Sequence, residues 1–168
     1  SYDYLAQDAG ELSMQDSETA YEMVVSALTD YYRATWSGSD IKLEAFIENE
    51  NLIKYTEKKI QAQRKVYVTE EVNVEIGAWE VDYTDDEHGG FLYLKIPAEI
   101  FKDIGSYGEV TEFLVRNVNG KLEIVDWYTG AKDSYDFLVR GENETIDKPN
   151  IWDDSEWVKK VVRKQNEY

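Results

Sequence analysis

The pattern of apolar and polar residues at positions 110–129 predicts a β-hairpin. Two alternating stretches flank Asn119-Gly120, and this dipeptide favours a tight I′ turn because both residues tolerate positive φ angles. With a two-residue turn, Phe113 pairs with Asp126, which places one carboxylate on an apolar face. The opposite face then carries three apolar residues, and these are Leu114, Val125 and Trp127.

Apolar residues at helical spacing predict a first helix from about Glu18 to Trp36. Asp16 or Ser17 is suited to cap its first turn, and Gly38 is suited to a left-handed end. Similar patterns predict three further helical segments. They are a short one at about 40–47, a longer one at about 51–64 and a last one from about Asp153.

A strand region at 66–84 changes its apolar phase at Gly77-Ala78. A glycine at such a slip is typical of a β-bulge that bends the strand. A second strand at 91–96 is expected to stop pairing at Pro97, which lacks a backbone N–H. Two segments remain, and we expect a connection with one helical turn at 98–108 and a short strand or irregular segment at 133–141.

This order of elements predicts an α+β fold, with N-terminal helices packed on one face of a curved, mostly antiparallel sheet and a C-terminal helix after it. Residues 1–17 carry acidic side chains and no basic ones, so we expect an acidic, flexible lead-in. Residues 18–168 are expected to form a single domain, with a C-terminal extension from about 130. The chain starts at Ser1, which is compatible with the removal of an export signal.

The formal charge of −17 over 168 residues narrows the range of partners. Phosphate backbones and anionic membrane surfaces repel such a charge, so nucleic-acid binding is not expected. No apolar run reaches the roughly 20 residues of a spanning helix, so no membrane insertion is expected in this segment. The chain has no cysteine, which excludes disulfides, thiol nucleophiles and cysteine-ligated zinc. We expect neither a metal ion nor another cofactor.

One basic cluster occurs in this acidic chain, on the helix predicted at 51–64. A solvated helix face is the simplest explanation, and a docking patch for an acidic partner, or for an acidic segment of this protein itself, is the alternative. The cluster consists of Lys54, Lys58, Lys59, Arg64 and Lys65.

Candidate catalytic side chains are few. Asp126 is the best acid or base candidate, because burial on an apolar face favours the protonated form of a carboxyl group. The alternative is a solvated or hydrogen-bonded Asp126 without a catalytic role. His88 is the sole histidine and belongs to a polar turn, where a solvated imidazole is expected. A cation at residues 85–90 is disfavoured, since they lack the spacing of a calcium loop.

Aromatic side chains are abundant, with 13 Tyr, 5 Trp and 5 Phe. Core packing is the simplest explanation, and an aromatic ligand pocket is the alternative. Together with Asp126, the residues expected to line such a pocket are Tyr32, Trp36, Trp79 and Phe113.

Three features together resemble the nuclear-transport-factor-2-like, or cystatin-like, superfamily of cone-shaped folds. They are the helix that ends in YYRATWSGSD (31–40), the bent strand after the helices, and the hairpin NGKLEIVDWY (119–128). The resemblance covers residues 18–129 and implies that helices and a curved sheet enclose a cavity. The superfamily includes isomerases, dehydratases, association domains and exported bacterial domains, so the resemblance does not assign a reaction.

From these observations we expect a non-enzymatic, exported bacterial association or accessory domain, secreted or tethered to the cell surface. It would act as a homodimer through Leu114, Val125 and Trp127, or together with an envelope protein. One alternative is a small-molecule binder, or an isomerase- or dehydratase-like enzyme, that uses Asp126 in the cone cavity. Another is the N-terminal regulatory module of a cell-wall hydrolase. A cytoplasmic location is also compatible with the sequence.

Overall fold

The structure is a computed structural model that describes residues 3–64, 69–141 and 146–168. These ranges contain four α-helices, which are α1 (Ser17–Ser37), α2 (Glu50–Gln63), α3 (Tyr135–Arg140) and α4 (Ser155–Asn166). They also contain five strands, which are β1 (Asn73–Ile76), β2 (Glu80–Asp86), β3 (Gly89–Lys102), β4 (Gly105–Val118) and β5 (Lys121–Thr129). Three short 3-10 turns complete the elements, and these are η1 (Met14–Asp16), η2 (Leu43–Ala45) and η3 (Ile151–Asp153).

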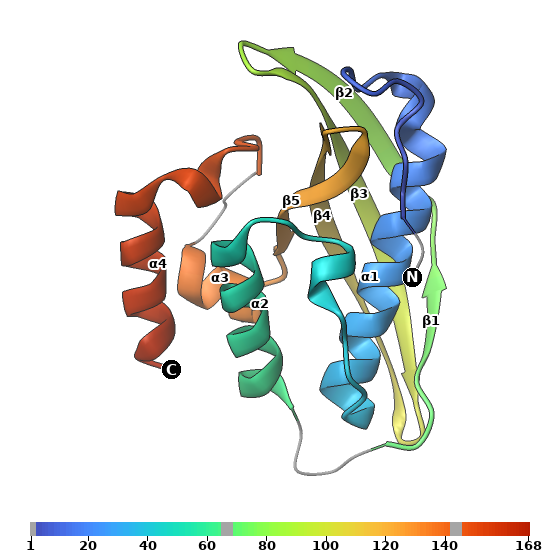
Figure 1. Ribbon diagram of the computed structural model, residues 1–168. Coiled ribbons are helices and arrows are strands. Elements are labelled where there is room, and N and C mark those ends of the chain that lie inside the picture. Colours follow the sequence, from blue (N-terminus) through green and yellow to red (C-terminus); the bar gives the residue numbers. More distant parts are fainter. Residues whose placement is uncertain (1–2, 65–68, 142–145) are drawn as a thin grey trace.

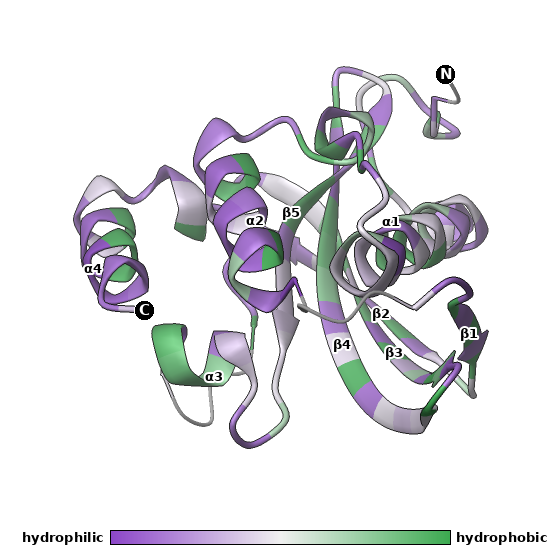
Figure 2. Cartoon of the chain, turned by 90° about the horizontal axis from the view of Figure 1, so that it is seen from below, coloured by the Kyte–Doolittle hydropathy of each residue, from purple (hydrophilic) through white to green (hydrophobic). Residues whose placement is uncertain are grey.

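The strands form one curved antiparallel sheet, and α1 lies along its concave face (Figure 1). One edge of β3 pairs with both β1 and β2, the other edge pairs with β4, and β5 follows β4. Figure 2, seen from below, shows α1 inside the curve of β3 and β4, and α3 and α4 on the far side of α2 and β5. The predicted α+β fold, with helices on a curved antiparallel sheet, is therefore confirmed.

One core joins α1 to the sheet. Leu28 of α1 and Ile124 of β5 belong to the same cluster of buried side chains and are 1% and 0% exposed. The bounds of α1 agree with the predicted first helix to within one residue at each end. Gly38 ends α1 in the left-handed region with a φ of 72°, as predicted. Asp16 is the N-cap residue, but its side chain makes no capping hydrogen bond to this helix.

The turn between β4 and β5 has the predicted geometry. Asn119 and Gly120 have φ angles of 56° and 88°, and two positive φ angles are what a I′ turn requires. Near the turn the register is also as predicted, because Val115 pairs with Ile124.

Further from the turn, the predicted register is wrong. A β-bulge shifts the pairing so that Leu114 lies opposite Asp126, which makes Val125 an extra residue on β5. Phe113 consequently pairs with Trp127 and not with Asp126. Beyond the bulge, each β5 side chain therefore points to the face opposite to the predicted one.

The first strand region is interrupted at Gly77, where the sequence predicted a bend. Pro97 lies opposite this interruption, and its carbonyl accepts a hydrogen bond from the Gly77 N–H at 2.9 Å. The N–H and C=O of one residue in an antiparallel strand point to the same neighbour, so the missing N–H of Pro97 faces the gap between β1 and β2. The prediction that pairing stops at Pro97 is wrong, because β3 continues to Lys102.

Two further segments, 98–108 and 133–141, differ from their predicted structure. Residues 98–108 contain no helical turn, because β3 and β4 extend through them and meet at a tight turn. Residues 133–141 contain α3 and not a strand, and the Ser134 side chain caps this helix by accepting a hydrogen bond from Phe137 N at 3.1 Å. The last helix starts two residues later than Asp153, and Asp154 caps it.

Residues 3–16 pack against the β4–β5 hairpin, whereas the sequence predicted a flexible lead-in. The N–H of Leu122 donates to the carbonyl of Tyr4 at 2.7 Å, and the Tyr4 side chain is buried. The carboxylate of Asp16, also buried, accepts a hydrogen bond from Ser13 N at 3.0 Å. An acidic composition therefore did not indicate disorder here, because Tyr4, Leu12 and the carboxylate of Asp16 are buried in the fold.

The sheet face that points away from α1 carries a smaller second core. Leu114 and Tyr128 belong to it, and Ile146 from the segment before η3 covers them. This segment lies on the opposite side of the sheet from α1. The part of the chain from about residue 130 is thus an integral layer of the fold, which contacts α2, β5 and the outer sheet face.

Candidate functional site

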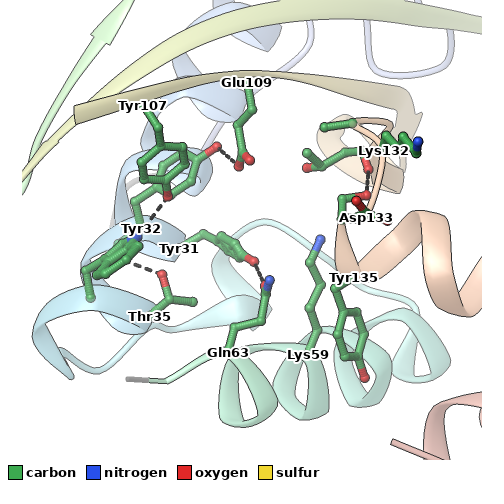
Figure 3. A pocket seen from close by; sticks show the side chains of 14 residues that line it. Tyr31, Tyr32, Thr35, Lys59, Gln63, Tyr107, Glu109, Lys132, Asp133 and Tyr135 are labelled. Carbon is green, nitrogen blue, oxygen red and sulfur yellow. Dashed lines mark hydrogen bonds between the residues drawn. The ribbon is translucent and has the colours of Figure 1, made fainter. Parts of the chain in front are cut away.

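A cavity of about 280 Å³ opens between α1, the C-terminal half of α2, β4 and the segment that joins β5 to α3 (Figure 3). We call it the tyrosine cavity. The lining side chains that matter for its chemistry are Tyr31, Tyr32, Trp36, Lys59, Tyr107 and Glu109.

Helix α1 supplies one wall of the tyrosine cavity. Tyr31, Tyr32 and Trp36 lie on its last two turns, within the apolar stripe that faces the sheet. The hydroxyl of Tyr32 donates to Glu109 Oε2 on β4 at 2.6 Å, and the hydroxyl of Tyr31 donates to the Gln63 side chain on α2. These two hydrogen bonds hold both phenol rings in fixed positions at the junction of the three elements.

The mouth of the cavity is aromatic. The indole Nε1 of Trp36 donates to the hydroxyl of Tyr107 at 2.8 Å. The ammonium of Lys102 lies 3.8 Å from the centroid of the Trp36 ring, which is a cation–π contact. Because the hydroxyl of Tyr107 accepts the indole proton, its own O–H remains a donor for a ligand.

The cavity floor contains a buried ion pair between α2 and α3. The Nζ of Lys59 on α2 lies 2.6 Å from Asp136 Oδ2 on α3, and the two side chains are 5% and 0% exposed. Asp136 also accepts hydrogen bonds from the hydroxyl of Tyr55 at 2.6 Å and from Thr129 N at 2.8 Å. The prediction that Lys59 belongs to a solvated basic face is wrong, because α3 covers this side of α2. Lys65 of the same cluster lies outside the described residues.

The phenols of the cavity are hydrogen-bond donors and not bases. Burial and the negative charges of Asp136 and Glu109 raise the pKa of Tyr31 well above the ordinary value. Burial and the charge of Glu109 do the same to the pKa of Tyr32. Burial also raises the pKa of Tyr107 to about 12, although the hydrogen bond from Trp36 opposes this. All three hydroxyls therefore stay protonated at neutral pH.

Two of the predicted pocket residues line the tyrosine cavity, and the others do not. Tyr32 and Trp36 contribute to its wall. Phe113 is fully buried in the core. Trp79 stacks on Tyr21 with 4.2 Å between ring centroids, at another part of α1.

Asp126, the predicted acid or base, lies outside the cavity and has a structural environment. The bulge in β5 moves it to the outer face, where its two oxygens each lie 2.9 Å from a terminal nitrogen of Arg140. Its Oδ1 also accepts a hydrogen bond from Trp152 Nε1 at 2.9 Å. Asp126 therefore connects β5 to α3 and η3.

The predicted dimer face is not exposed. Leu114 is 0% exposed beneath the segment that contains Ile146, and Trp127 is 3% exposed among the rings of Tyr31 and Phe113. Val125 is partly buried and packs on the second core. Two of the three residues are thus core residues, and the bulge places Trp127 on the face opposite to Leu114.

Sequence reasoning missed Tyr107 and Glu109, although a signal was present. Tyr107, Glu109, Thr111 and Phe113 alternate along β4, and alternate residues of a strand point to one face. The assignment of residues 98–108 to a connection hid this alternation. His88, in contrast, lies in an exposed turn as predicted, with 61% of its side chain exposed.

Among the described residues, no group of three or more His, Cys, Asp or Glu side chains is arranged to hold a metal ion. None of the helices in those same ranges is long and apolar enough to cross a membrane. Comparison with known proteins does not add a function, because no family model, no curated protein and no solved structure matches this chain.

Proposed function

We propose that this protein is a non-enzymatic binding domain whose tyrosine cavity holds a small, polar, ring-shaped molecule. One observation carries the proposal. Hydrogen-bonding groups of opposite character, the carboxylate of Glu109 and the ammonium of Lys59, face the same aromatic-walled cavity as the hydroxyl of Tyr107 (Figure 3).

These groups define the chemistry of the ligand. Glu109 accepts one hydrogen bond from Tyr32, and its other carboxylate oxygen is available to accept from a ligand donor. Lys59 donates to Asp136, and the two further protons of its ammonium are available to a ligand acceptor. The proposed ligand therefore has a donor and an acceptor on opposite sides, as a hydroxylated ring or a nitrogen heterocycle does.

The size of the cavity sets the size of the ligand. About 280 Å³ lies just below the usual range of small-molecule pockets, which begins at about 300 Å³. Each water molecule accounts for about 30 Å³ of liquid volume, so a cavity of about 280 Å³ has room for about nine waters or one small ring. The rings of Trp36 and Tyr107 at its mouth are suited to stack on the flat side of such a molecule.

Binding without turnover fits the side chains better than catalysis does. Lys59 is an ion-paired ammonium with no free lone pair, and the tyrosine hydroxyls remain protonated. Among the described residues, the two carboxylates that line the cavity are those of Glu109 and the exposed Asp133, and one oxygen of Glu109 already accepts the hydroxyl proton of Tyr32. The proposal is overturned if the protein converts a bound ring compound in a manner that Glu109→Gln abolishes.

A fragment screen monitored by ¹H–¹⁵N NMR tests the proposed ligand class. The indole N–H resonance of Trp36 is the reporter, because its proton is held in the cavity wall by Tyr107. Polar ring fragments are expected to shift this resonance in a saturable way. Glu109→Gln is expected to weaken their binding about five- to tenfold, since a charged acceptor becomes a neutral one.

Glu112→Gln is the matched control. Glu112 accepts a hydrogen bond from the hydroxyl of Tyr93, so it repeats the tyrosine–glutamate pair of the cavity at another position on β4. Fragment affinity in this variant is expected to equal that of the wild type. Equal weakening in both variants, or no saturable shift at Trp36 with any polar ring fragment, rejects the proposal.

The proposal also includes the cellular location of the protein and its role as an accessory domain. The curved sheet around α1 supports the resemblance to the nuclear-transport-factor-2-like superfamily, and the high negative charge is compatible with an exported bacterial accessory domain. In this role, occupancy of the tyrosine cavity would be communicated to an envelope partner. Sequencing of the complete reading frame on both sides of residues 1–168, followed by fractionation of the source cells, tests this part.

A further inference from the structure

A second cavity, of about 330 Å³, lies beside the β4–β5 hairpin. It is separate from the tyrosine cavity and is lined by the hairpin, by the loop before α2 and by the segment that leads into η3. We call it the hairpin cavity. Three carboxylate side chains contribute to its wall, from Glu48, Glu123 and Asp153, and its apolar wall includes Val118, Val125 and Pro149.

Glu123 is the unusual member of this set. It is 5% exposed, and its Oε2 atom has no hydrogen-bond partner among the described residues. Its Oε1 atom lies 3.3 Å from Lys121 Nζ, and that ammonium is shared with Asp3 at 3.8 Å. A buried carboxylate oxygen without a partner is costly, and this one belongs to a side chain that lines an open cavity.

The arginine opposite Glu123 does not neutralise it. Arg116 pairs with Glu123 in the register of the hairpin, so the two residues are direct cross-strand neighbours. The guanidinium is turned toward Asp86, with 2.7 Å between Arg116 Nη2 and Asp86 Oδ2, and it also donates to the carbonyl of Gly90 at 3.1 Å. Arg116 also lines the hairpin cavity, but its charge is balanced by Asp86, so Glu48, Glu123 and Asp153 leave the wall with an excess of negative charge.

The remaining negative charge and the apolar wall indicate the type of ligand. The carboxylates do not converge as metal ligands do, because no metal-holding group of three or more acidic, His or Cys side chains occurs among the described residues. A bare metal ion would also leave the walls formed by Val118, Val125 and Pro149 without contacts. An ammonium or guanidinium group on a short alkyl chain matches both the negative charge and the apolar wall of the hairpin cavity. The cation pairs with Glu123, and the alkyl chain covers the apolar wall.

We propose that the hairpin cavity binds a small organic cation, an alkylamine or alkylguanidine, with Glu123 as the anchoring carboxylate. Glu48 and Asp153 line the same cavity and add to its attraction for a cation. The site does not depend on the tyrosine cavity, so it is tested by itself.

Isothermal titration calorimetry of the whole chain with agmatine, which carries a guanidinium and an ammonium on a four-carbon chain, tests the proposal. The titration is made at about 0.15 M salt, where exposed charges more than about 8 Å apart are largely screened. Saturable one-to-one binding is expected for the wild type. Glu123→Gln is expected to weaken it about tenfold or more, as the loss of a charged hydrogen bond implies.

Glu22→Gln is the matched control, because Glu22 is an exposed carboxylate on α1 and its removal changes the net charge by the same amount. The affinity for agmatine is expected to stay within about twofold of the wild type. A neutral diol of the same chain length, 1,4-butanediol, is expected not to bind. Glu123→Gln keeps the shape of a side chain whose buried Oε2 atom has no hydrogen-bond partner among the described residues, so the variant should fold, which far-UV circular dichroism checks.

Three results overturn the proposal. They are no saturable binding of agmatine to the wild type, equal weakening by Glu123→Gln and Glu22→Gln, and binding of the diol with the affinity of agmatine. The second result identifies general attraction to the acidic surface as the cause. The third identifies the apolar wall alone as the binding element.

Discussion

The carboxylate of Asp126 and the guanidinium of Arg140 form a buried two-pronged ion pair, with 2.9 Å between Oδ1 and Nη1 and 2.9 Å between Oδ2 and Nη2. The side chains are 2% and 0% exposed. Parallel hydrogen bonds of this kind are stronger and more specific than a single contact. Because the two residues lie on β5 and α3, the ion pair fixes the position of α3 on the sheet.

Asp126→Ala is expected to lower the free energy of unfolding by about 3–5 kcal/mol, because it removes the carboxylate that accepts both hydrogen bonds of this buried ion pair. Urea denaturation measures this loss. The double variant Asp126→Leu/Arg140→Met is expected to recover much of it, since a buried ion pair can be replaced by apolar side chains. A double variant less stable than Asp126→Ala alone would contradict this account.

Asp86→Ala provides the comparison for this prediction. It breaks the ion pair with Arg116, whose charged atoms are 2.7 Å apart, but the Asp86 side chain is 28% exposed and reaches solvent. Solvent screens such a pair and compensates for its loss. The decrease in unfolding free energy should therefore be clearly smaller than for Asp126→Ala.

Lys59 and Lys58 should respond differently although they are neighbours in the sequence. Lys59→Met leaves the carboxylate of Asp136 buried without its ammonium partner, and we expect a loss of about 3–5 kcal/mol. Lys58→Met removes an exposed side chain and is expected to change stability by no more than about 0.5 kcal/mol. Thermal and urea unfolding of the two variants measure these changes in unfolding free energy. Equal losses in both variants would contradict the burial of Lys59.

Leu28→Ala is expected to reduce the free energy of unfolding by about 2–5 kcal/mol, because Leu28 is 1% exposed in the core that joins α1 to the sheet. Val162→Ala on α4 is the control, since this apolar side chain is 37% exposed. Its effect should be about 0.5 kcal/mol or less. Similar losses in both variants would show that α1 does not pack as described.

Local chemistry explains which parts of the fold the sequence predicted. Gly38 ends α1, and Asn119 and Gly120 form the I′ turn, because each of these positions has a φ angle that few other residues adopt. The stripe of apolar residues in α1 is equally local. Such features depend on neighbours within a few residues, so one sequence is sufficient to predict them.

The errors concern contacts between distant segments. Lys59 is buried because Asp136, 77 residues away in the chain, meets it on α3. Pro97 is tolerated inside β3 because a partner strand is interrupted opposite it. The bulge at Val125 is one residue long, and the alternation of β5 looks unbroken from the sequence alone.

The residues of the candidate site also divide into those that local sequence patterns predict and those that they do not. Tyr32 and Trp36 were predicted as pocket residues because they lie on the apolar stripe of a helix that the sequence indicates clearly. Tyr107 and Glu109 lie on a strand whose first residues were assigned to a connection, so they were missed. Asp126 was selected from a register that the bulge shifts by one residue, which moves its side chain to the other face.

Glu123 should make the stability of this protein depend on pH in the direction opposite to that of most carboxylates. Burial raises the pKa of Glu123, Lys121 opposes the shift, and the negative charges of Glu48 and Asp3 add to it. Arg116, the cross-strand neighbour, is paired with Asp86. At a pH between the pKa values of Glu123 in the unfolded and folded states, the folded state binds more protons than the unfolded state. The contribution of Glu123 to the free energy of unfolding therefore falls as the pH rises.

Glu123→Gln removes this dependence. We expect the variant to be more stable than the wild type at about pH 7, and the difference to shrink as the pH falls toward about 4, where the wild-type side chain becomes protonated in both states. Urea unfolding of both proteins at a series of pH values measures the difference, with Glu22→Gln as the exposed control. A variant that is less stable at neutral pH, or an advantage that grows in acid, would mean that the buried oxygen of Glu123 has a partner in solution. A bound cation in the hairpin cavity produces the first of these results, so the protein is dialysed free of amines before the measurement.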